Sequence, residues 1–323
     1  MKTPLVTIFG GSGLLGRYAV RAFADAGWRI RAGVRHPNLA HYLPPMGHVG
    51  QIMVAKADVT DADSVAAAMR GADVVVNLVG VLTQSGHQSF EAIHVEGAET
   101  VARAAKAIGA RLIHVSAIGA DPDSDSSYAK SKGEGEARVR AVDPMATILR
   151  PSLAFGPEDN FFNRFAGLAR MLPVLPLIGG GHTKFQPVFA GDIGDAILKC
   201  TTDETTQGKT YELGGPAVYS FKALMEFILR ETGRSRALVP VPFFIASIKA
   251  AFLGMLPNPL LTMDQVRLLK HDTTVSSGAL GFKDLGIEPD ALEAVAPAYL
   301  WRFRAKGQYD EPVREKIIAS SGT

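Results

Sequence analysis

Hydrophobic positions in the first half of the chain form short apolar runs that alternate with longer amphipathic segments. The short runs are rich in β-branched residues and match strands, whereas the longer segments are rich in Ala and match helices. The expected strands are Leu5–Phe9, Arg29–Val34, Gln51–Ala57, Asp73–Val79, Arg111–Val115 and Ala146–Arg150. The expected helices are Leu14–Ala26, one after an Asp61 cap, Gln88–Ile108 and Ser127–Val142. This alternation predicts an α/β fold with a doubly wound parallel sheet.

The regular alternation breaks down after Pro151, where proline and glycine become denser. We expect an extended segment at Lys184–Val188, a strand at Thr210–Gly214 and helices at Ala190–Cys200, Phe221–Thr232, Phe243–Met255 and Ala291–Ala305. The pattern predicts a first domain over residues 1–155, rejoined by the strand near 210–214. A smaller, mainly helical C-terminal lobe is expected over 156–305, and a flexible polar tail over 306–323.

The composition excludes several classes of protein. Of 323 residues, 47% are hydrophobic and 20% are charged, which is typical of a globular chain with a large core. Lys+Arg 34 against Asp+Glu 32 gives a net charge of +2, and no basic run points to nucleic acid. One cysteine, Cys200, excludes a disulfide within the chain and favours a reducing compartment. The eight histidines show no paired spacing for a metal site, so we expect no metal.

A glycine-rich loop follows the first expected strand directly and leads into the first expected helix. It reads Gly10, Gly11, Ser12, Gly13, Leu14, Leu15 and Gly16. A sharp strand-to-helix turn needs backbone angles that residues with a Cβ rarely adopt, and a diphosphate must approach bare N–H groups at the helix start. At the first strand–helix junction, this spacing predicts a Rossmann dinucleotide site. A glycine turn without a ligand is the alternative.

The residues after the second expected strand favour NADP(H) over NAD(H). An NAD site usually has a carboxylate there for the ribose 2′-hydroxyl, but this chain has Arg35 and no carboxylate until Asp58. A guanidinium can bind the extra 2′-phosphate in a forked geometry, and Arg17 could clamp the same group. The alternative for both arginines is a solvated surface position. Asp58 and Val59 are expected beside the adenine, although Asp58 fits a turn or cap equally well.

Two further segments are expected to contact the cofactor. Leu78, Val79 and Gly80 end the fourth strand and are expected beside the ribose at the carboxyl edge of the sheet, where ligands bind in open α/β folds. Tyr128 and Lys132 share a face of one expected helix, because they are four residues apart. A lysine ammonium near a phenol favours the phenolate and can also hold the nicotinamide ribose. The spacing is common by itself, and its place after the fifth strand gives it weight.

These motifs together resemble the short-chain dehydrogenase/reductase superfamily, in its extended or atypical branch. The segment Arg150–Pro157 is similar to one that approaches the nicotinamide in that branch, so the resemblance implies that Pro151, Ser152 and Leu153 contact the cofactor. Active members use a Ser or Thr to polarise the substrate carbonyl. That position falls on Ala117 by our alignment, with Ser116 one residue early, and a shift of one register would make Ser116 the catalytic hydroxyl.

A closer resemblance covers nearly the whole chain. It rests on His114-Val115-Ser116, Phe155-Gly156-Pro157-Glu158-Asp159, Gln186-Pro187-Val188 and Asp284-Leu285-Gly286-Ile287. These motifs resemble the NADPH-binding accessory-subunit family of respiratory complex I (NADH:ubiquinone oxidoreductase). The resemblance implies NADPH as a structural or regulatory cofactor, complex I subunits or quinone metabolism as partners, and a degraded catalytic centre. The alternatives are a free NADPH-dependent oxidoreductase or epimerase that uses Tyr128 and Lys132 on a carbonyl or quinone-related substrate, and a redox-sensing binder.

The segment Val239–Leu261 is almost wholly apolar, with Lys249 as its single charge. Its four prolines forbid one spanning helix, and no other apolar run is long enough to cross a bilayer. The segment is therefore expected either in the core of the lobe or in contact with a partner or membrane surface. Because the chain begins a strand at Leu5, no signal peptide is expected. The expected location is the bacterial cytoplasm, with peripheral attachment to the inner membrane left open.

Overall fold

The computed structural model describes residues 3–86, 88–253 and 261–307. The chain forms two compact units that are discontinuous in sequence. The first unit comprises Met1–Ser152, Ala190–Gly214 and Thr274–Pro289. The second comprises Leu153–Phe189, Gly215–Thr273 and Asp290–Thr323. Two later segments thus belong to the first unit although the sequence analysis assigns most of them to the C-terminal lobe, and the division into domains stays a prediction.

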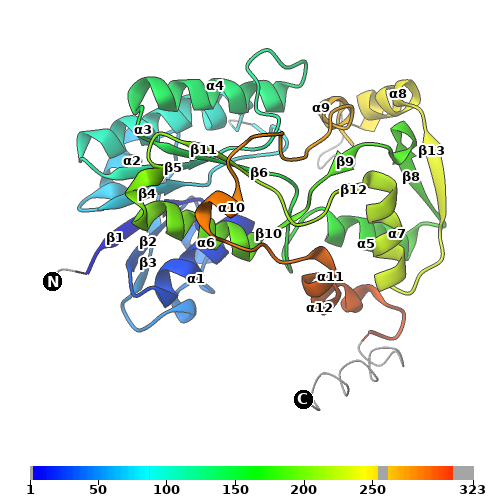
Figure 1. The fold of residues 1–323 in the computed structure, drawn as a ribbon, viewed down its shortest axis with the longest axis horizontal. Helices are drawn as coiled ribbons and strands as arrows, with labels where there is room; N and C mark the ends of the chain where they lie inside the picture. The colour runs from blue at the N-terminus through cyan, green and yellow to red at the C-terminus, as the bar shows by residue number, and fades with distance from the viewer. Residues whose placement is uncertain (1–2, 87, 254–260, 308–323) are drawn as a thin grey trace. The chain divides into compact units, whose positions relative to one another are not determined.

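A seven-stranded parallel sheet forms the centre of the first unit, as the alternation of strands and helices predicted (Figure 1). The strand order is β11-β6-β5-β4-β1-β2-β3. Strands β2 and β3 are added on one side of β1 and strands β4 to β6 on the other, so the strand order reverses between β1 and β4. The expected strand near 210–214 is β11, which pairs with β6 at the edge. The strands are β1 Leu5–Phe9, β2 Arg29–Val34, β3 Ile52–Lys56, β4 Val74–Asn77, β5 Arg111–Val115, β6 Thr147–Pro151 and β11 Thr210–Leu213.

Helices cover both faces of this sheet, with α1 and α6 on one face and α2, α3 and α4 on the other (Figure 1). Asp61 caps α2 as expected, because its side chain accepts from the N–H groups of Asp63 and Ser64. The helices of this unit are α1 Leu14–Asp25, α2 Ala62–Met69, α3 Gly97–Ala107, α4 Ser127–Val142, α6 Ala190–Thr202 and α10 Phe282–Leu285. Short 3-10 turns are η1 Pro37–Leu39, η2 Pro44–Met46 and η5 Glu204–Thr206.

The expected long helix over Gln88–Ile108 is wrong in its first part. Residues Glu91–Glu96 form a π-helix, η3, which runs directly into α3. A π-helix widens the turn and shifts the carbonyl groups outward, which side-chain periodicity does not reveal. The carbonyl oxygen of His94 in η3 approaches α4 so closely that a Cβ on Gly135 would lie 2.0 Å from it.

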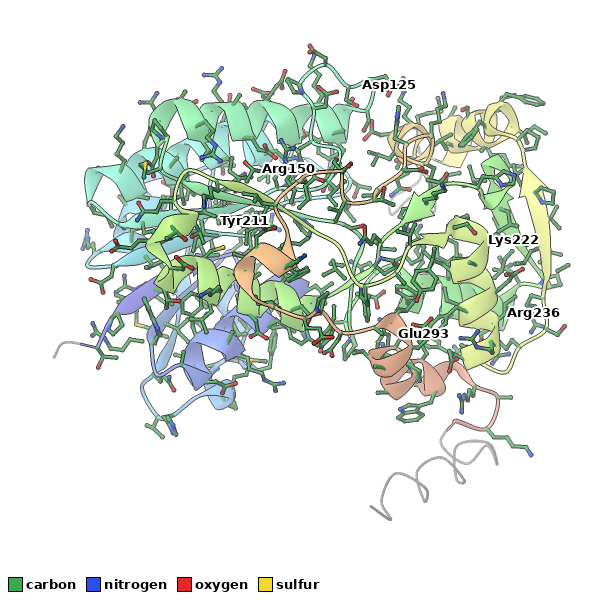
Figure 2. All side chains as sticks on the ribbon, in the orientation of Figure 1. Asp125, Arg150, Tyr211, Lys222, Arg236 and Glu293 are labelled. Carbon is green, nitrogen blue, oxygen red and sulfur yellow. The ribbon has the colours of Figure 1, made fainter. Side chains whose placement is uncertain are left out.

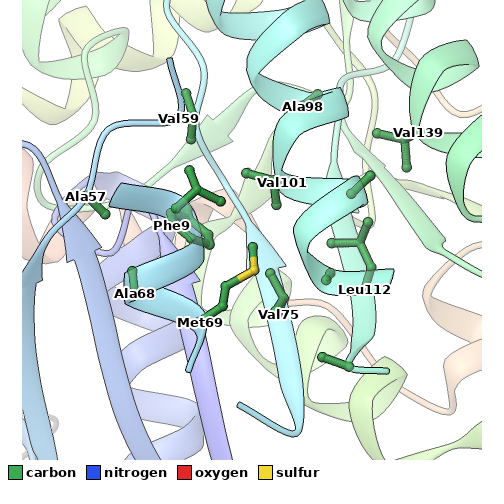
Figure 3. Packing of buried hydrophobic residues seen from close by; sticks show 14 of the residues in the cluster. Phe9, Ala57, Val59, Ala68, Met69, Val75, Ala98, Val101, Leu112 and Val139 are labelled. Carbon is green, nitrogen blue, oxygen red and sulfur yellow. The ribbon is translucent and has the colours of Figure 1, made fainter. Parts of the chain in front are cut away.

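The core between the sheet and α2, α3 and α4 is built from aliphatic residues of modest size (Figure 3). Phe9, Val75 and Leu112 contribute from three adjacent strands, and Met69 and Val101 contribute from the helices. All five are almost completely buried. The predominance of Ala and Val allows the helices to pack close to the sheet and holds the strand ends that form the site.

The second unit combines helices with three small two-stranded sheets around a cluster of phenylalanines. Phe155, Phe162 and Phe221 are its largest fully buried side chains. The strands are β7 Ala154–Phe155, β8 Val174–Ile178, β9 Lys184–Phe185, β10 Val188–Phe189, β12 Tyr219–Ser220 and β13 Ala237–Val241. The helical segments are α5 Phe162–Met171, η4 Gly179–Gly181, α7 Phe221–Glu231, α8 Phe243–Leu253, α9 Met263–Leu268, α11 Leu292–Val295, α12 Pro297–Leu300 and η6 Trp301–Phe303.

Two expected elements of this unit are divided by proline. The extended segment Lys184–Val188 forms the separate strands β9 and β10 on either side of Gln186 and Pro187. The expected helix Ala291–Ala305 is broken into α11, α12 and η6, with Pro297 at the first position of α12. The last part of the expected helix Phe243–Met255 and the expected tail after Gly307 lie outside the described residues.

A partly buried ion network ties the edge strand β11 to α4 and β6 in the first unit. The Arg150 guanidinium, labelled in Figure 2, donates to both carboxylate oxygens of Glu136, with Nη2 2.7 Å from Oε2. Its Nη1 lies 3.7 Å from Oε1 of Glu212. The other Glu212 oxygen accepts the Ser276 N–H at 2.7 Å, so the network also fixes the returning segment Thr274–Pro289.

Replacing Arg150 with Met should destabilise the protein by about 3 kcal/mol, because it leaves the buried carboxylate of Glu136 without its partner. Urea unfolding of Arg150→Met beside wild type measures this difference. Arg103→Ala, which removes a largely exposed ion pair with Glu99, is the matched control and should not shift the transition measurably. An unfolding midpoint of Arg150→Met equal to that of the control would contradict a stabilising role for the network.

Candidate dinucleotide site

The turn from β1 into α1 has the backbone geometry that a diphosphate site requires. Gly10 adopts a φ of 77°, and the Gly13 N–H donates to the Gly10 carbonyl at 3.0 Å. A Cβ on Gly16 would lie 2.2 Å from the Gly10 oxygen, so only glycine lets α1 start this close to the turn. The helix begins after Gly13 with no side-chain cap and no acidic residue in its first turn. Its positive end is therefore available to an anion.

A cavity of about 190 Å³ lies at the carboxyl ends of β1, β2 and β4. The structure brings nine of the predicted cofactor residues to its walls: Gly10, Ser12, Gly13, Arg35, Asp58, Val59, Leu78, Val79 and Gly80. It also places residues there that the sequence analysis missed: Phe9, Gly33, Val34, Ala57, Val81 and Ile93. Gly33 carried a usable signal, because a glycine inside a strand indicates close approach. A Cβ there would lie 3.1 Å from the Phe9 ring and 3.2 Å from Ala57 Cβ.

Four glycine-loop residues, Gly11, Leu14, Leu15 and Gly16, do not line the cavity, and the two glycines have packing roles. A Cβ on Gly11 would lie 2.9 Å from that of Ala32 in β2. Gly11 and Gly16 thus allow backbone segments to meet. The role of all four residues in cofactor binding stays a prediction.

Arg17 is also absent from the cavity wall, and it contacts an aromatic residue that the sequence analysis did not identify. Its guanidinium carbon lies 4.7 Å from the centre of the Tyr42 ring, and its Nη2 donates to the Tyr42 hydroxyl at 3.3 Å. The same hydroxyl donates to the carbonyl of Ser12 at 2.5 Å. Tyr42 therefore fastens the segment between β2 and β3 onto the glycine loop and holds Arg17 beside it.

Asp58 forms the turn that was one of its two expected roles, and its place beside the adenine stays a prediction. Its Oδ1 accepts from the Thr60 N–H at 3.0 Å and from the Thr60 hydroxyl at 2.8 Å, as in an Asx turn. Asp58 also lines the cavity together with Arg35. The turn fixes the carboxylate in place, so the cavity has one acidic wall and one basic wall.

Helix α4 places Lys132 against the end of β5. Ser126 caps the helix by accepting the Ala129 N–H, and the Lys132 ammonium donates to the Val115 carbonyl at 3.3 Å. Lys132 is only 5% exposed. Burial lowers the pKa of its ammonium to about 8, although the Glu136 carboxylate opposes the shift. A Cβ on Gly80 would lie 3.3 Å from Lys132 Nζ, so the ammonium lies next to Gly80 in the cavity wall.

The expected phenolate character of Tyr128 is not found. Burial raises the pKa of the half-buried Tyr128 phenol to about 12. The phenol is therefore protonated at neutral pH and is suited to donate a hydrogen bond or a proton. The spacing of Tyr128 and Lys132 favoured a phenolate, whereas desolvation of the phenol dominates its pKa in the folded chain.

The loop after β5 contains a hydroxyl that its protein neighbours leave unsatisfied. Ser116 is 5% exposed, and its Oγ has no hydrogen-bond partner within the described part of the chain. It directly follows Val115, the acceptor of the Lys132 ammonium. An unsatisfied buried hydroxyl is costly, and a bound ligand group would remove the cost.

The remaining predicted residues lie in both units. Pro151 ends β6, and its carbonyl accepts the Ile118 N–H at 3.0 Å, which places Pro151 beside the loop that follows Ser116. Ser152 is also buried and donates its N–H to Leu213. Leu153 begins the second unit and packs against the phenylalanine cluster there.

These features together fit an NAD(P) dinucleotide. The uncapped helix start matches a diphosphate, and the cavity lies where the sheet order reverses, as in other doubly wound folds. Ser116 and Lys132 have hydrogen-bonding capacity that the surrounding protein does not use fully. Among the described residues there is no cluster of three or more potential metal ligands, and none of the described helices is long and apolar enough to cross a membrane.

The burial of Lys132 predicts a specific pH dependence of stability. Its pKa is about 8 in the folded chain and 10.5 when exposed, so below pH 8 the folded state carries the full cost of the buried charge. Lys132→Met should therefore stabilise the cofactor-free protein by about 3 kcal/mol at pH 7. The gain should shrink as pH rises from 8 to 10.5, because the wild-type lysine then loses its proton on folding. Urea unfolding at several pH values measures it, and a constant difference would refute the assignment.

Comparison with known proteins extends the similarity over the whole chain. A family model described as NAD(P)H-binding matches residues 10–159. NADH dehydrogenase (ubiquinone) 1 alpha subcomplex subunit 9 of Arabidopsis thaliana, a mitochondrial protein, is 37% identical over 327 residues, covering 97% of this chain and 81% of the relative. The mitochondrial NADH-ubiquinone oxidoreductase 40 kDa subunit of Neurospora crassa is 34% identical over 308 residues, covering 95% of this chain and 81% of its own.

A solved structure extends the comparison to the fold. The NADPH-dependent quinone oxidoreductase QOR2 from Escherichia coli, solved with NADPH, superposes with a TM-score of 0.72 at 22% identity, covering 92% of this chain and 99% of that one. This likeness concerns the fold alone. The relatives confirm the resemblance drawn from the motifs: the chain carries an NAD(P)H-binding domain and belongs to the family of NADH dehydrogenase (ubiquinone) 1 alpha subcomplex subunit 9.

Proposed function

We propose that this protein holds NADP(H) as a resident cofactor and acts as an accessory, assembly or regulatory component of respiratory complex I. The observation that carries the proposal is the cavity with Arg35 on its wall beside an uncapped helix start. Near full-length similarity to subunits of NADH:ubiquinone oxidoreductase supports the choice of partner.

The proposed contacts follow the cavity from the adenine to the nicotinamide. Asp58 and Val59 lie at the adenine, and the glycine loop holds the diphosphate through its N–H groups. At the other end, Lys132 holds the ribose hydroxyls and Tyr128 donates from its protonated phenol. When bound, the cofactor supplies a hydride at its nicotinamide. The remaining proposed contacts there are Leu78, Val79, Gly80, Pro151, Ser152 and Ser116, and Leu153 stays a prediction from sequence.

The preference for NADP(H) over NAD(H) rests on Arg35. It follows β2 at the carboxyl edge of the sheet, where a ribose 2′-substituent is bound in such folds. A guanidinium offers paired donors to a phosphate, whereas it offers a lone hydroxyl much less. Asp58, the carboxylate that also lines the cavity, already accepts two hydrogen bonds from Thr60 and is separated from Arg35 along the chain by the whole of β3.

Arg35→Ala should weaken NADPH binding at least tenfold and leave NADH binding within about twofold, because it removes a charge-assisted contact that only the 2′-phosphate can make. Calorimetric titration of wild type and variant with both cofactors measures the difference. Arg103→Ala removes another exposed arginine, on α3 and outside the cavity lining, and should change neither affinity. Wild-type protein that binds NADH as tightly as NADPH would refute the proposed selectivity.

A second candidate function is a free NADPH-dependent reductase or epimerase. Tyr128 and Lys132 on one helix beside the unsatisfied Ser116 hydroxyl favour it, since these are the groups that would bind and protonate a carbonyl oxygen. In this case Tyr128 would serve as the proton donor. Sustained NADPH oxidation with a panel of carbonyls and quinones, lost in Tyr128→Phe, would favour this candidate over a resident cofactor.

The second unit offers a surface through which the protein would attach peripherally to the cytoplasmic face of a membrane. Helix α8 packs Ala246 and Ala250 against Ile178 and Val266, which leaves Phe244 66% exposed and Ile248 57% exposed one turn apart. Two exposed apolar side chains on one helix face match the insertion of a helix into the headgroup region of lipid. We therefore propose that the occupant of this face is a lipid surface.

Replacing both Phe244 and Ile248 with Gln should abolish flotation of the purified protein with anionic liposomes, because the variant removes the apolar groups that enter the lipid. Leu39→Gln, at a side chain that is 70% exposed in the first unit, is the control and should float like wild type. Wild type that stays in the soluble fraction but co-purifies with NADH dehydrogenase subunits from native membranes would assign the face to a protein partner instead. Failure of both would contradict the proposed attachment.

A further inference from the structure

Buried His94 connects the loop that lines the cavity to the helix that carries Tyr128 and Lys132. Its Nε2 accepts the N–H of Val81, at the end of the cavity wall, at 3.0 Å. Its Nδ1 lies 2.8 Å from the hydroxyl of Ser131 on α4. The side chain is 2% exposed, and both of its nitrogens are engaged.

The direction of these bonds is fixed by the backbone. A main-chain N–H can only donate, so Nε2 carries no proton, and a neutral imidazole then has its proton on Nδ1. Nδ1 therefore donates to the Ser131 hydroxyl, which in turn donates to the Tyr128 carbonyl at 2.8 Å. A directed chain of three hydrogen bonds thus runs from the cavity loop to the backbone of the tyrosine.

Two features of the backbone hold this histidine in place. The π-helix η3 presents His94 towards α4, and Gly135 lets the His94 carbonyl approach to a distance that any Cβ would obstruct. Two aromatic rings pack around the imidazole. The Phe90 ring is stacked on it with 5.4 Å between the ring centres, and the Tyr128 ring lies perpendicular to it with 5.5 Å between the centres. π-helical turns occur frequently at functional positions.

The imidazole stays neutral, which suits a permanent connector. Burial, together with smaller effects of Lys132 and His114, lowers the pKa of His94 to about 3. A Cβ on Gly80 would lie 3.5 Å from His94 Nε2 and 3.3 Å from Lys132 Nζ, so the His94 imidazole and the Lys132 ammonium both lie next to Gly80 in the loop after β4.

We propose that His94 is a positioning residue, which holds the loop over Leu78–Val81 in register with Tyr128 and Lys132 and so pre-forms the nicotinamide half of the site. This inference rests on the proposed binding of NADP(H). Without the imidazole, the loop and α4 would be ordered relative to each other only when the cofactor binds, and that ordering would subtract from its affinity. The adenine half, held by the glycine loop and β2, does not depend on this connection.

The test compares two ligands on His94→Phe, which keeps the ring and its stacking on Phe90 and removes both polar atoms. NADPH contains both halves, whereas adenosine 2′,5′-bisphosphate carries only the adenine ribose and its phosphates. We expect His94→Phe to weaken NADPH binding roughly tenfold and to change binding of the bisphosphate by less than about twofold. The emission maximum of bound NADPH should also shift towards that of free NADPH, because its nicotinamide is less ordered.

Two further variants keep the test informative if His94→Phe does not fold. His94→Gln supplies one acceptor and one donor and should restore most of the NADPH affinity. Ser131→Ala interrupts only the α4 side of the chain and should produce a smaller loss confined to NADPH. Equal weakening of both ligands, or no weakening of either, would overturn the positioning role. Wild type that binds neither ligand would instead overturn the proposed cofactor.

Discussion

The contact between Gly16 and the Gly10 carbonyl is the constraint on which the dinucleotide site depends. A Cβ on Gly16 would lie 2.2 Å from the Gly10 oxygen, so only glycine lets α1 begin directly beneath the end of β1, and no side chain caps its first N–H groups. The parallel strands on either side then bring their own carboxyl ends to the same edge. Arg35 arrives from β2, and Leu78 to Gly80 arrive from β4, without any further specialised structure.

Most of this arrangement could be predicted because local chemistry determines it. The bounds of β1, β5 and α4 agree with the expected strands Leu5–Phe9 and Arg111–Val115 and the expected helix Ser127–Val142. Apolar runs, glycine turns and serine caps act over a few residues, so they can be interpreted from one sequence. The alternation of strands and helices then predicts parallel pairing of the strands. Parallel pairing in turn predicts that the carboxyl ends of the strands lie at one edge of the sheet.

The parts that escaped prediction depend on contacts between distant segments. Tyr42 reaches the glycine loop from an irregular connection, and His94 contacts α4 from the π-helix η3. Neither residue has a motif, and a lone histidine or tyrosine in a sequence has no interpretable partner. The pKa of Tyr128 was misjudged for the same reason, since desolvation is a property of the packed structure and not of the spacing between two residues.

The discontinuity of the first unit has a consequence for its synthesis. Its sheet is completed at one edge by β11, where the Glu212 N–H donates to the Leu280 carbonyl and the Glu212 side chain accepts the Ser276 N–H from the segment Thr274–Pro289. A growing polypeptide that has emerged only as far as β6 therefore has an open sheet edge and an Arg150–Glu136 pair without Glu212. Such an edge is prone to unwanted pairing. Residues up to about 280 must therefore leave the ribosome before the segment Thr274–Pro289 can pack against β11 and the nucleotide-binding half can close.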